Sequence, residues 1–218
     1  MPSKHVLEAR ELADRLQDSL PNSIDAASLG VRSKAPFQVL CTREALIWRT
    51  EELARNACDA LDREDLSVAA ILTRAVMESA AVAWKLLDIL ERRDKLSANE
   101  IFKQLEKLLV GSKLWADFPQ PYQILKLVDL IDKRLPGFRE RYDALSEIAH
   151  PNWRGVLGLY SKIDAPKYAV HFGRSLRSPD TTKEAVELAL LGSLEIFVHS
   201  YNRVTDLMPA FLAELDPS

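Results

Sequence analysis

The chain has 218 residues, of which 47% are hydrophobic and 28% are charged, and its formal net charge is −3. This composition excludes a mainly disordered chain. The net charge excludes a global positive field that would attract nucleic acid or an anionic membrane, so any such binding requires a local patch. Because no linker rich in proline, glycine or serine divides the sequence, we expect a single helical domain over residues 1–218.

The sequence carries no recognisable targeting, metal or cofactor motif. Cys41 and Cys58 are the two cysteines, and neither a CxxC pair nor a histidine at ligand spacing accompanies them, so we predict no disulfide framework, no metal site and no cofactor. No phosphate-binding glycine loop or DNA-reading motif occurs. The most apolar stretch, Val68 to Leu90, contains charged side chains that are costly in a bilayer. With the charged N-terminus, this predicts a cytoplasmic protein that does not span a membrane.

The first part of the chain, residues 1–41, is predicted to form one helix and a wrapping loop. Ser3 is a good N-cap for a helix that ends near Leu20, before Pro21. Residues 21–41 contain two prolines and a glycine without a sustained apolar period, which is typical of irregular structure. Thr42 is the expected N-cap of the next helix, over residues 43–61.

Residues 42–151 are predicted to form the core of the bundle. After the helix over 43–61, a helix over 66–93 is apolar on nearly all sides, as expected of a central helix. Ser97 and Glu100 form a capping box that begins a helix over 97–110. Pro121 suits the first turn of a helix over 121–133, and a further helix is expected over 137–150.

The last part of the chain contains a basic loop, residues 152–179, and a long helix, residues 180–215. Within the loop, residues 157–174 are predicted to form either a short two-stranded hairpin or an ordered loop. Thr181 with Glu184 resembles a second capping box. The long helix carries an apolar seam that belongs either to the intramolecular core or to a homodimer. We therefore predict an all-α, up-and-down helical bundle with a long C-terminal helix. The seam consists of Leu190, Leu194, Phe197, Tyr201, Val204, Met208, Phe211 and Leu215.

Arg74 and Glu78 are the first pair of residues that suggest chemistry. They are spaced i, i+4 within an apolar helix, so they lie on one face and within pairing distance. A buried unpaired charge costs several kcal/mol, so each charge must find a partner or reach a cleft. One interpretation is a structural ion pair, and the other is a polar pocket that binds an anion or orients a catalytic group.

A second polar stripe, Tyr142, Ser146 and His150, follows the helix over 137–150 at four-residue intervals. His150 stands at the helix C-terminus, where the negative end of the helix dipole favours the protonated imidazole. It is therefore a candidate general acid or anion contact. The alternative is a capping histidine that bonds to backbone carbonyls or to Ser146.

The segment after His150 is the one locally basic and aromatic region of the chain. Asn152 is a candidate polar contact and Arg154 a candidate phosphate contact in this segment. Such a region is either a solvated loop or an edge that contacts phosphate groups. Its cations are Arg154, Lys162, Lys167, Arg174 and Arg177, and its aromatic residues are Trp153, Tyr160, Tyr168, His171 and Phe172.

Two motifs, TRAVMESA with its Arg74-x-x-x-Glu78 and YDALSEIAHP with its Tyr-x-x-Leu-Ser-x-x-x-His-Pro, resemble those of uncharacterised bacterial families of HEPN-like helical bundles. The resemblance covers residues 42–152 and the last helix. It implies an up-and-down bundle, often dimeric, and either a metal-independent ribonuclease of toxin or phage-defence systems or a protein that binds nucleotides or partners. The ribonuclease members carry Arg-x(4 to 6)-His on one late helix, and here Arg139 and Arg141 stand further from His150 than that spacing.

These observations lead to two functional hypotheses. The first is a binding or interaction module with a polar pocket for a nucleotide or an RNA-type anion. The alternative is a metal-independent ribonuclease in which His150, Arg74 and Glu78 are catalytic. In both hypotheses the binding residues are Tyr142, Ser146, Asn152 and Arg154, and the expected partners are RNA or a nucleotide and a second copy bound through the C-terminal helix.

Overall fold

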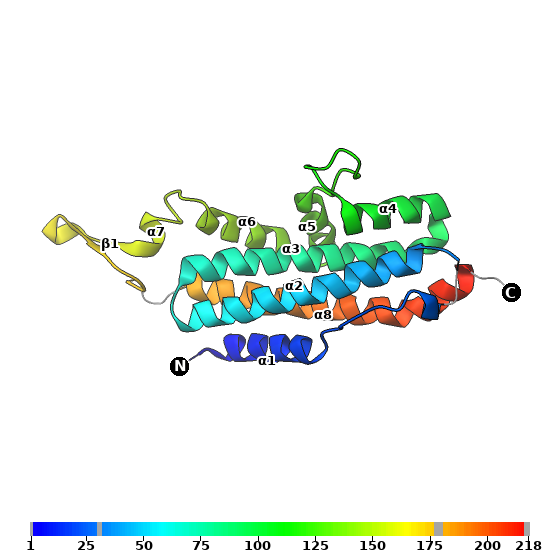
Figure 1. Ribbon diagram of the computed structural model, residues 1–218. Coiled ribbons are helices and arrows are strands. Elements are labelled where there is room, and N and C mark those ends of the chain that lie inside the picture. The colour runs from blue at the N-terminus through cyan, green and yellow to red at the C-terminus, as the bar shows by residue number, and fades with distance from the viewer. Residues whose placement is uncertain (1, 30–31, 177–180, 216–218) are drawn as a thin grey trace.

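Three long helices, lying side by side, form the body of the molecule in the computed structural model (Figure 1). They are α2 (Ala35–Asp62), α3 (Leu66–Glu91) and α8 (Thr181–Leu215), and α1 (Lys4–Asp18) packs against α2 and α8. The structure describes residues 2–29, 32–176 and 181–215. The predicted all-α bundle with a long C-terminal helix is confirmed. Ser3 caps α1 as predicted, because its Oγ accepts a hydrogen bond of 3.3 Å from the backbone N–H of Val6.

The core of the bundle consists of two apolar clusters that follow each other along the long helices. α3 contributes to both, with buried residues around most of its circumference, and burying each large side chain contributes about 1.5–3 kcal/mol. Most of the α8 seam lies in this core, which is the intramolecular alternative. A homodimer stays a prediction, and it would require another face of α8. The buried seam residues are Leu190, Leu194, Phe197, Val204, Met208 and Phe211.

α2 begins earlier than the sequence indicated. The prediction of irregular structure holds for the described residues of 21–34, which contain one short 3-10 turn, Ala27–Leu29. It is wrong for residues 35–41, as is the prediction that Thr42 caps the helix, because α2 starts at Ala35 and Thr42 is a buried residue within it. Pro36 occupies the first turn of α2, where a missing N–H costs nothing. Ala35 and Val39 are buried in the second apolar cluster, so tertiary packing extends the helix through residues that lack a clear apolar period.

Three shorter helices follow α3 in the chain: α4 (Ala98–Val110), which packs on α2 and α3, and α5 (Ile124–Asp132) and α6 (Phe138–Ala149), which pack on α3. The predicted capping box is confirmed, because Ser97 Oγ accepts from the Glu100 N–H and the Glu100 carboxylate accepts from the Ser97 N–H. Pro121, in contrast, lies before α5. It packs closely on Gly111, at which a Cβ would lie 2.8 Å from the Pro121 Cα. Gln123 is the N-cap and has an extended backbone conformation, so α5 begins at Ile124 and not at Pro121 as predicted.

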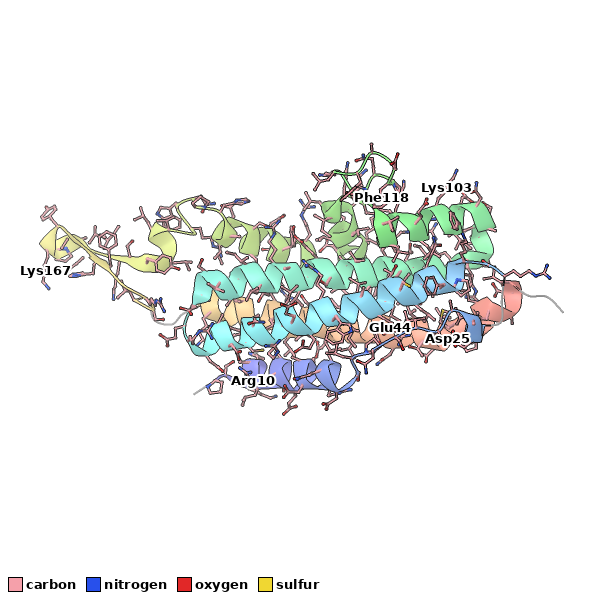
Figure 2. The ribbon with its side chains drawn as sticks, viewed as in Figure 1. Arg10, Asp25, Glu44, Lys103, Phe118 and Lys167 are labelled. Carbon is pink, nitrogen blue, oxygen red and sulfur yellow. The ribbon has the colours of Figure 1, made fainter. Side chains whose placement is uncertain are left out.

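Residues 152–176 form an arm that extends beyond the end of the bundle (Figure 1). The arm contains α7 (Leu157–Tyr160) and an antiparallel hairpin of β1 (Ser161–Asp164) and β2 (Ala169–Phe172). The hairpin alternative is therefore confirmed. Figure 2 shows Lys167 at the outer end of the arm. Residues 177–179 of the predicted basic loop, with Arg177, lie outside the described residues. α8 already includes Thr181, and the capping box of Thr181 with Glu184 stays a prediction.

Among the described residues, α3 is the one helix long and apolar enough to cross a membrane by length and composition. Half of its most apolar window is buried inside the bundle, and core helices of bundles share this composition. The feature is therefore weak evidence for a membrane span. A cytoplasmic location stays a prediction.

Candidate functional site

The Arg74 and Glu78 side chains meet Tyr142 where α6 packs on α3. Arg74 Nη2 donates a hydrogen bond of 2.9 Å to Tyr142 Oη, and this hydroxyl donates one of 2.8 Å to Glu78 Oε1. Arg74 Nη2 and Glu78 Oε1 lie 3.4 Å apart, and the Arg74 Cζ is 5.1 Å from the centre of the Tyr142 ring. We call these three residues the α3–α6 cluster. The sequence placed the pair on one helix face, and the structure adds the tyrosine that bridges it.

The α3–α6 cluster is buried at its tyrosine and partly open at its charges. Tyr142 is 2% exposed, whereas the Arg74 and Glu78 side chains are 32% and 28% exposed. Burial raises the pKa of Tyr142, and the hydrogen bond from Arg74 opposes part of that rise, so the phenol is a neutral donor at physiological pH. Arg74 Nε is buried and lacks a hydrogen-bond partner among the described residues. Both charges have partners inside the protein, which is the arrangement of a structural ion pair.

The structure does not bring His150 to this cluster. His150 is exposed and is the C-cap of α6, with its backbone N–H donating to the Ser146 carbonyl at 3.2 Å. Along the helix it stands about 12 Å beyond Tyr142, at 1.5 Å per residue. Ser146 lies between Tyr142 and His150 on α6 and is partly buried, and its Oγ donates a hydrogen bond of 2.9 Å to the Tyr142 carbonyl. The predicted polar stripe therefore separates into a buried tyrosine, a serine bonded to its own helix and an exposed histidine.

Asn152 shapes the turn that leads from α6 into the arm. Its Oδ1 accepts hydrogen bonds from the backbone N–H groups of Arg154 and Gly155, at 3.0 and 3.1 Å, and its Nδ2 donates to Glu147 Oε2 at 2.6 Å. An asparagine that bonds to the backbone two residues ahead is typical of a tight turn. Gly155 lies so close to α6 that a Cβ there would overlap the His150 carbonyl. Asn152 therefore orients the arm, and Arg154 is left exposed at its base.

The hairpin of the arm has two chemically different faces. Since paired residues share a face, Ile163, Val170 and Phe172 form an apolar face, and they are 72%, 47% and 72% exposed. Lys162 pairs with His171 on the opposite face. Both hairpin faces are thus accessible in this chain.

Ion pairs organise the tip and the base of the arm. Near the tip, Asp164 Oδ2 lies 3.2 Å from Lys167 Nζ and 3.7 Å from His171 Nε2. At the base, Arg174 Nη1 lies 2.6 Å from Asp65 Oδ1, which precedes α3. Lys162 and Arg154 form no ion pair among the described residues. These two cations are therefore free to bind an external anion.

A second cluster of an arginine, a glutamate and a tyrosine joins α2 to α8. Arg43 Nη1 lies 2.9 Å from Glu44 Oε1, Tyr201 Oη donates a hydrogen bond of 2.7 Å to Glu44 Oε2, and the Arg43 Cζ lies 3.9 Å from the centre of the Tyr201 ring. We call it the α2–α8 cluster. Sequence reasoning missed it, because adjacent residues on a helix do not share a face and Tyr201 is part of the apolar seam. The available signal was the pair of opposite charges, Arg43 and Glu44, in the first turn of the helix predicted over 43–61.

Comparisons of the chain with models of protein families, with curated proteins and with solved structures found no match. The HEPN-like resemblance therefore stays a prediction based on its two motifs.

Proposed function

We propose that this protein is a binding module for a single-stranded, RNA-type polyanion, and that the arm, residues 152–176, is the part that contacts the ligand. The observation that carries the proposal is the combination of exposed aromatic rings and cations on a projecting element. Trp153, Tyr168 and Phe172 are 65%, 99% and 72% exposed, and Lys162 and Arg154 have no ion-pair partner among the described residues.

Aromatic rings and cations together are what single-stranded nucleic acids require of a protein. Every base offers a flat face that stacks on an aromatic side chain, with about 1–3 kcal/mol per base, and lysine or arginine neutralises the phosphates. A net charge of −3 over the chain means that this attraction must be local. The arm meets that requirement, because Asp164 is its one acidic residue between 152 and 176.

The ribonuclease alternative receives less support from the geometry. A metal-independent mechanism needs a proton donor or acceptor and a cation at the same phosphate. His150 is exposed at the end of α6, whereas Arg74 is engaged with Tyr142 and Glu78. The polar cluster therefore supports a structural role, and the arm supports binding.

Fluorescence anisotropy with a labelled single-stranded RNA of about twelve nucleotides tests the proposal. We expect Tyr168→Ala with Phe172→Ala to weaken binding at least tenfold, because two stacking contacts of about 1–3 kcal/mol each are lost. Lys162→Gln should reduce the slope of log K against log salt by about 0.7, the contribution of one contact to a single strand.

Trp115 provides a matched control, because it is as exposed as Trp153, at 65%, and lies in the loop between α4 and α5. Trp153→Ala should weaken binding, and Trp115→Ala should leave it unchanged. The proposal fails if wild-type protein does not bind the RNA at about 50 mM salt, or if both tryptophan variants lose affinity equally.

A further inference from the structure

A groove beside α8 has the form of a small-molecule site that is separate from the arm. Its volume is 380 Å³, which is within the usual range for a ligand pocket. Its walls are the corner between α5 and α6 and one face of α8, and Met77 of α3 contributes to its floor. The apolar side chains on it include Leu135, Phe138, Leu188 and Ile196.

Gly192 keeps this groove open. It lies in the interior of the 35-residue helix α8, where glycine costs about 1 kcal/mol relative to alanine. Close packing does not explain the glycine, because a Cβ at this position would meet no heavy atom within 4 Å. The side chain that is absent here would instead project into the groove, which Gly192 lines.

Two arginines give the groove its charge. Arg134 and Arg141 line it and are exposed, and neither forms an ion pair among the described residues. The neighbouring Arg139 differs, because its guanidinium is held by Asp129 and Asp143. Unpaired guanidinium groups at the edge of an apolar groove complement a ligand with an anionic head and an apolar body, since arginine binds carboxylates and phosphates through paired hydrogen bonds. Glu195 is the one acidic residue among the described residues that line the groove. Its carboxylate opposes an anion, but the two guanidinium groups leave the lining with a net positive charge.

We propose that this groove binds a small amphipathic anion, with its carboxylate or phosphate head at Arg134 and Arg141 and its apolar body over Gly192. The headgroup chemistry is shared by aliphatic carboxylates and by alkyl phosphates. A linear body of about ten carbons fits a groove of this volume. This site does not depend on RNA binding by the arm.

Calorimetric titration of the full-length protein with decanoate, decyl phosphate and decanol tests the proposal. Decanoate or decyl phosphate should bind, and decanol should bind at least tenfold more weakly; the tighter of the two anions identifies the headgroup. Binding of decanol as tight as that of both anions, or no binding of either anion, would overturn the proposal.

Two variants locate the site. Gly192→Leu fills the groove while favouring the helix, so it should abolish anion binding with unchanged circular dichroism. Gly192→Ala places only a methyl group in the groove and should weaken binding less than Gly192→Leu. Arg134→Gln with Arg141→Gln should weaken binding at least tenfold. Lys103→Gln with Lys126→Gln removes the same charge from α4 and α5, outside the lining of the groove, and should leave binding unchanged.

Amide chemical shifts give a measurement that needs no variant. Titration of wild-type protein with decanoate should shift the backbone amide signals of Gly192 and Ser193. Shifts confined to the arm would place the ligand elsewhere and overturn the assignment.

Discussion

The α3–α6 and α2–α8 clusters are built from the same three residue types, yet they differ in exposure and in the position of the tyrosine. In the α3–α6 cluster the Tyr142 hydroxyl stands between Arg74 and Glu78, and these side chains are 32% and 28% exposed.

In the α2–α8 cluster the Arg43 guanidinium lies over the Tyr201 ring, and the Arg43 and Glu44 side chains are only 13% and 14% exposed. The Arg74–Glu78 pair, which its i, i+4 spacing predicts, is therefore more exposed than the Arg43–Glu44 pair, which no spacing pattern predicts. Since water screens the more exposed pair, we expect the α2–α8 cluster to contribute more to the free energy of unfolding than the α3–α6 cluster.

The largest expected effect is that of removing the carboxylate from each cluster. Glu44→Ala leaves the Arg43 charge and the Tyr201 hydroxyl without their partner in a mostly buried place, and we expect a loss of about 3 kcal/mol in the free energy of unfolding. Glu78→Ala should cost about 1 kcal/mol, because solvent reaches its partner. Urea denaturation of both variants measures the difference, and equal losses would contradict the distinction between the clusters.

A smaller effect is expected from pH, through the two tyrosines. Burial and the hydrogen bond to Glu44 raise the pKa of Tyr201 to about 12, and burial also raises the pKa of Tyr142. A phenol in the unfolded chain titrates near pH 10. Because the folded pKa is the higher one, the stability that the neutral phenol contributes is complete below about pH 10 and is lost as the pH rises towards 12.

Replacing each tyrosine with phenylalanine identifies which phenol causes the loss of stability at alkaline pH. Unfolding midpoints at about pH 9 and about pH 11 should differ less in Tyr201→Phe than in wild-type protein, because the variant has no phenol at this position to ionise. Tyr142→Phe should keep more of the wild-type difference. The reverse order would show that the α3–α6 cluster is the more strongly buried of the two in solution.

The sequence predicts the bundle well, because helix period and capping depend on neighbouring residues. Ser3, and Ser97 with Glu100, mark the N-termini of α1 and α4, because their side chains form capping hydrogen bonds with neighbouring backbone groups. The early start of α2 depends instead on the burial of Ala35 and Val39 against distant helices, which no local pattern contains. The sequence does not distinguish the hairpin of the arm from an ordered loop, because its strands are short and mostly exposed.

In the candidate site, too, the sequence predicts contacts within one helix but not the distance between residues on different helices. Spacing along one helix predicts that Arg74 and Glu78 share a face, and the structure places them 3.4 Å apart. The separation of His150 from them depends on where α6 ends relative to α3. Spacing within α6 alone cannot reveal this, because a stripe with four-residue intervals extends along the helix as well as around it.

The smallest expected effect is that of His150, and it tests whether this residue belongs to the α3–α6 cluster at all. An exposed helix end far from the cluster should contribute within about 0.5 kcal/mol, so His150→Ala should leave the unfolding free energy nearly unchanged. In a double-mutant cycle with Glu78→Ala, the coupling energy should be below about 0.5 kcal/mol, because the two sites share no partner. RNA incubated with wild-type protein and with His150→Ala in EDTA should show the same residual cleavage. A large coupling energy, together with cleavage that is lost in the variant, would instead unite His150 with the cluster and restore the ribonuclease hypothesis.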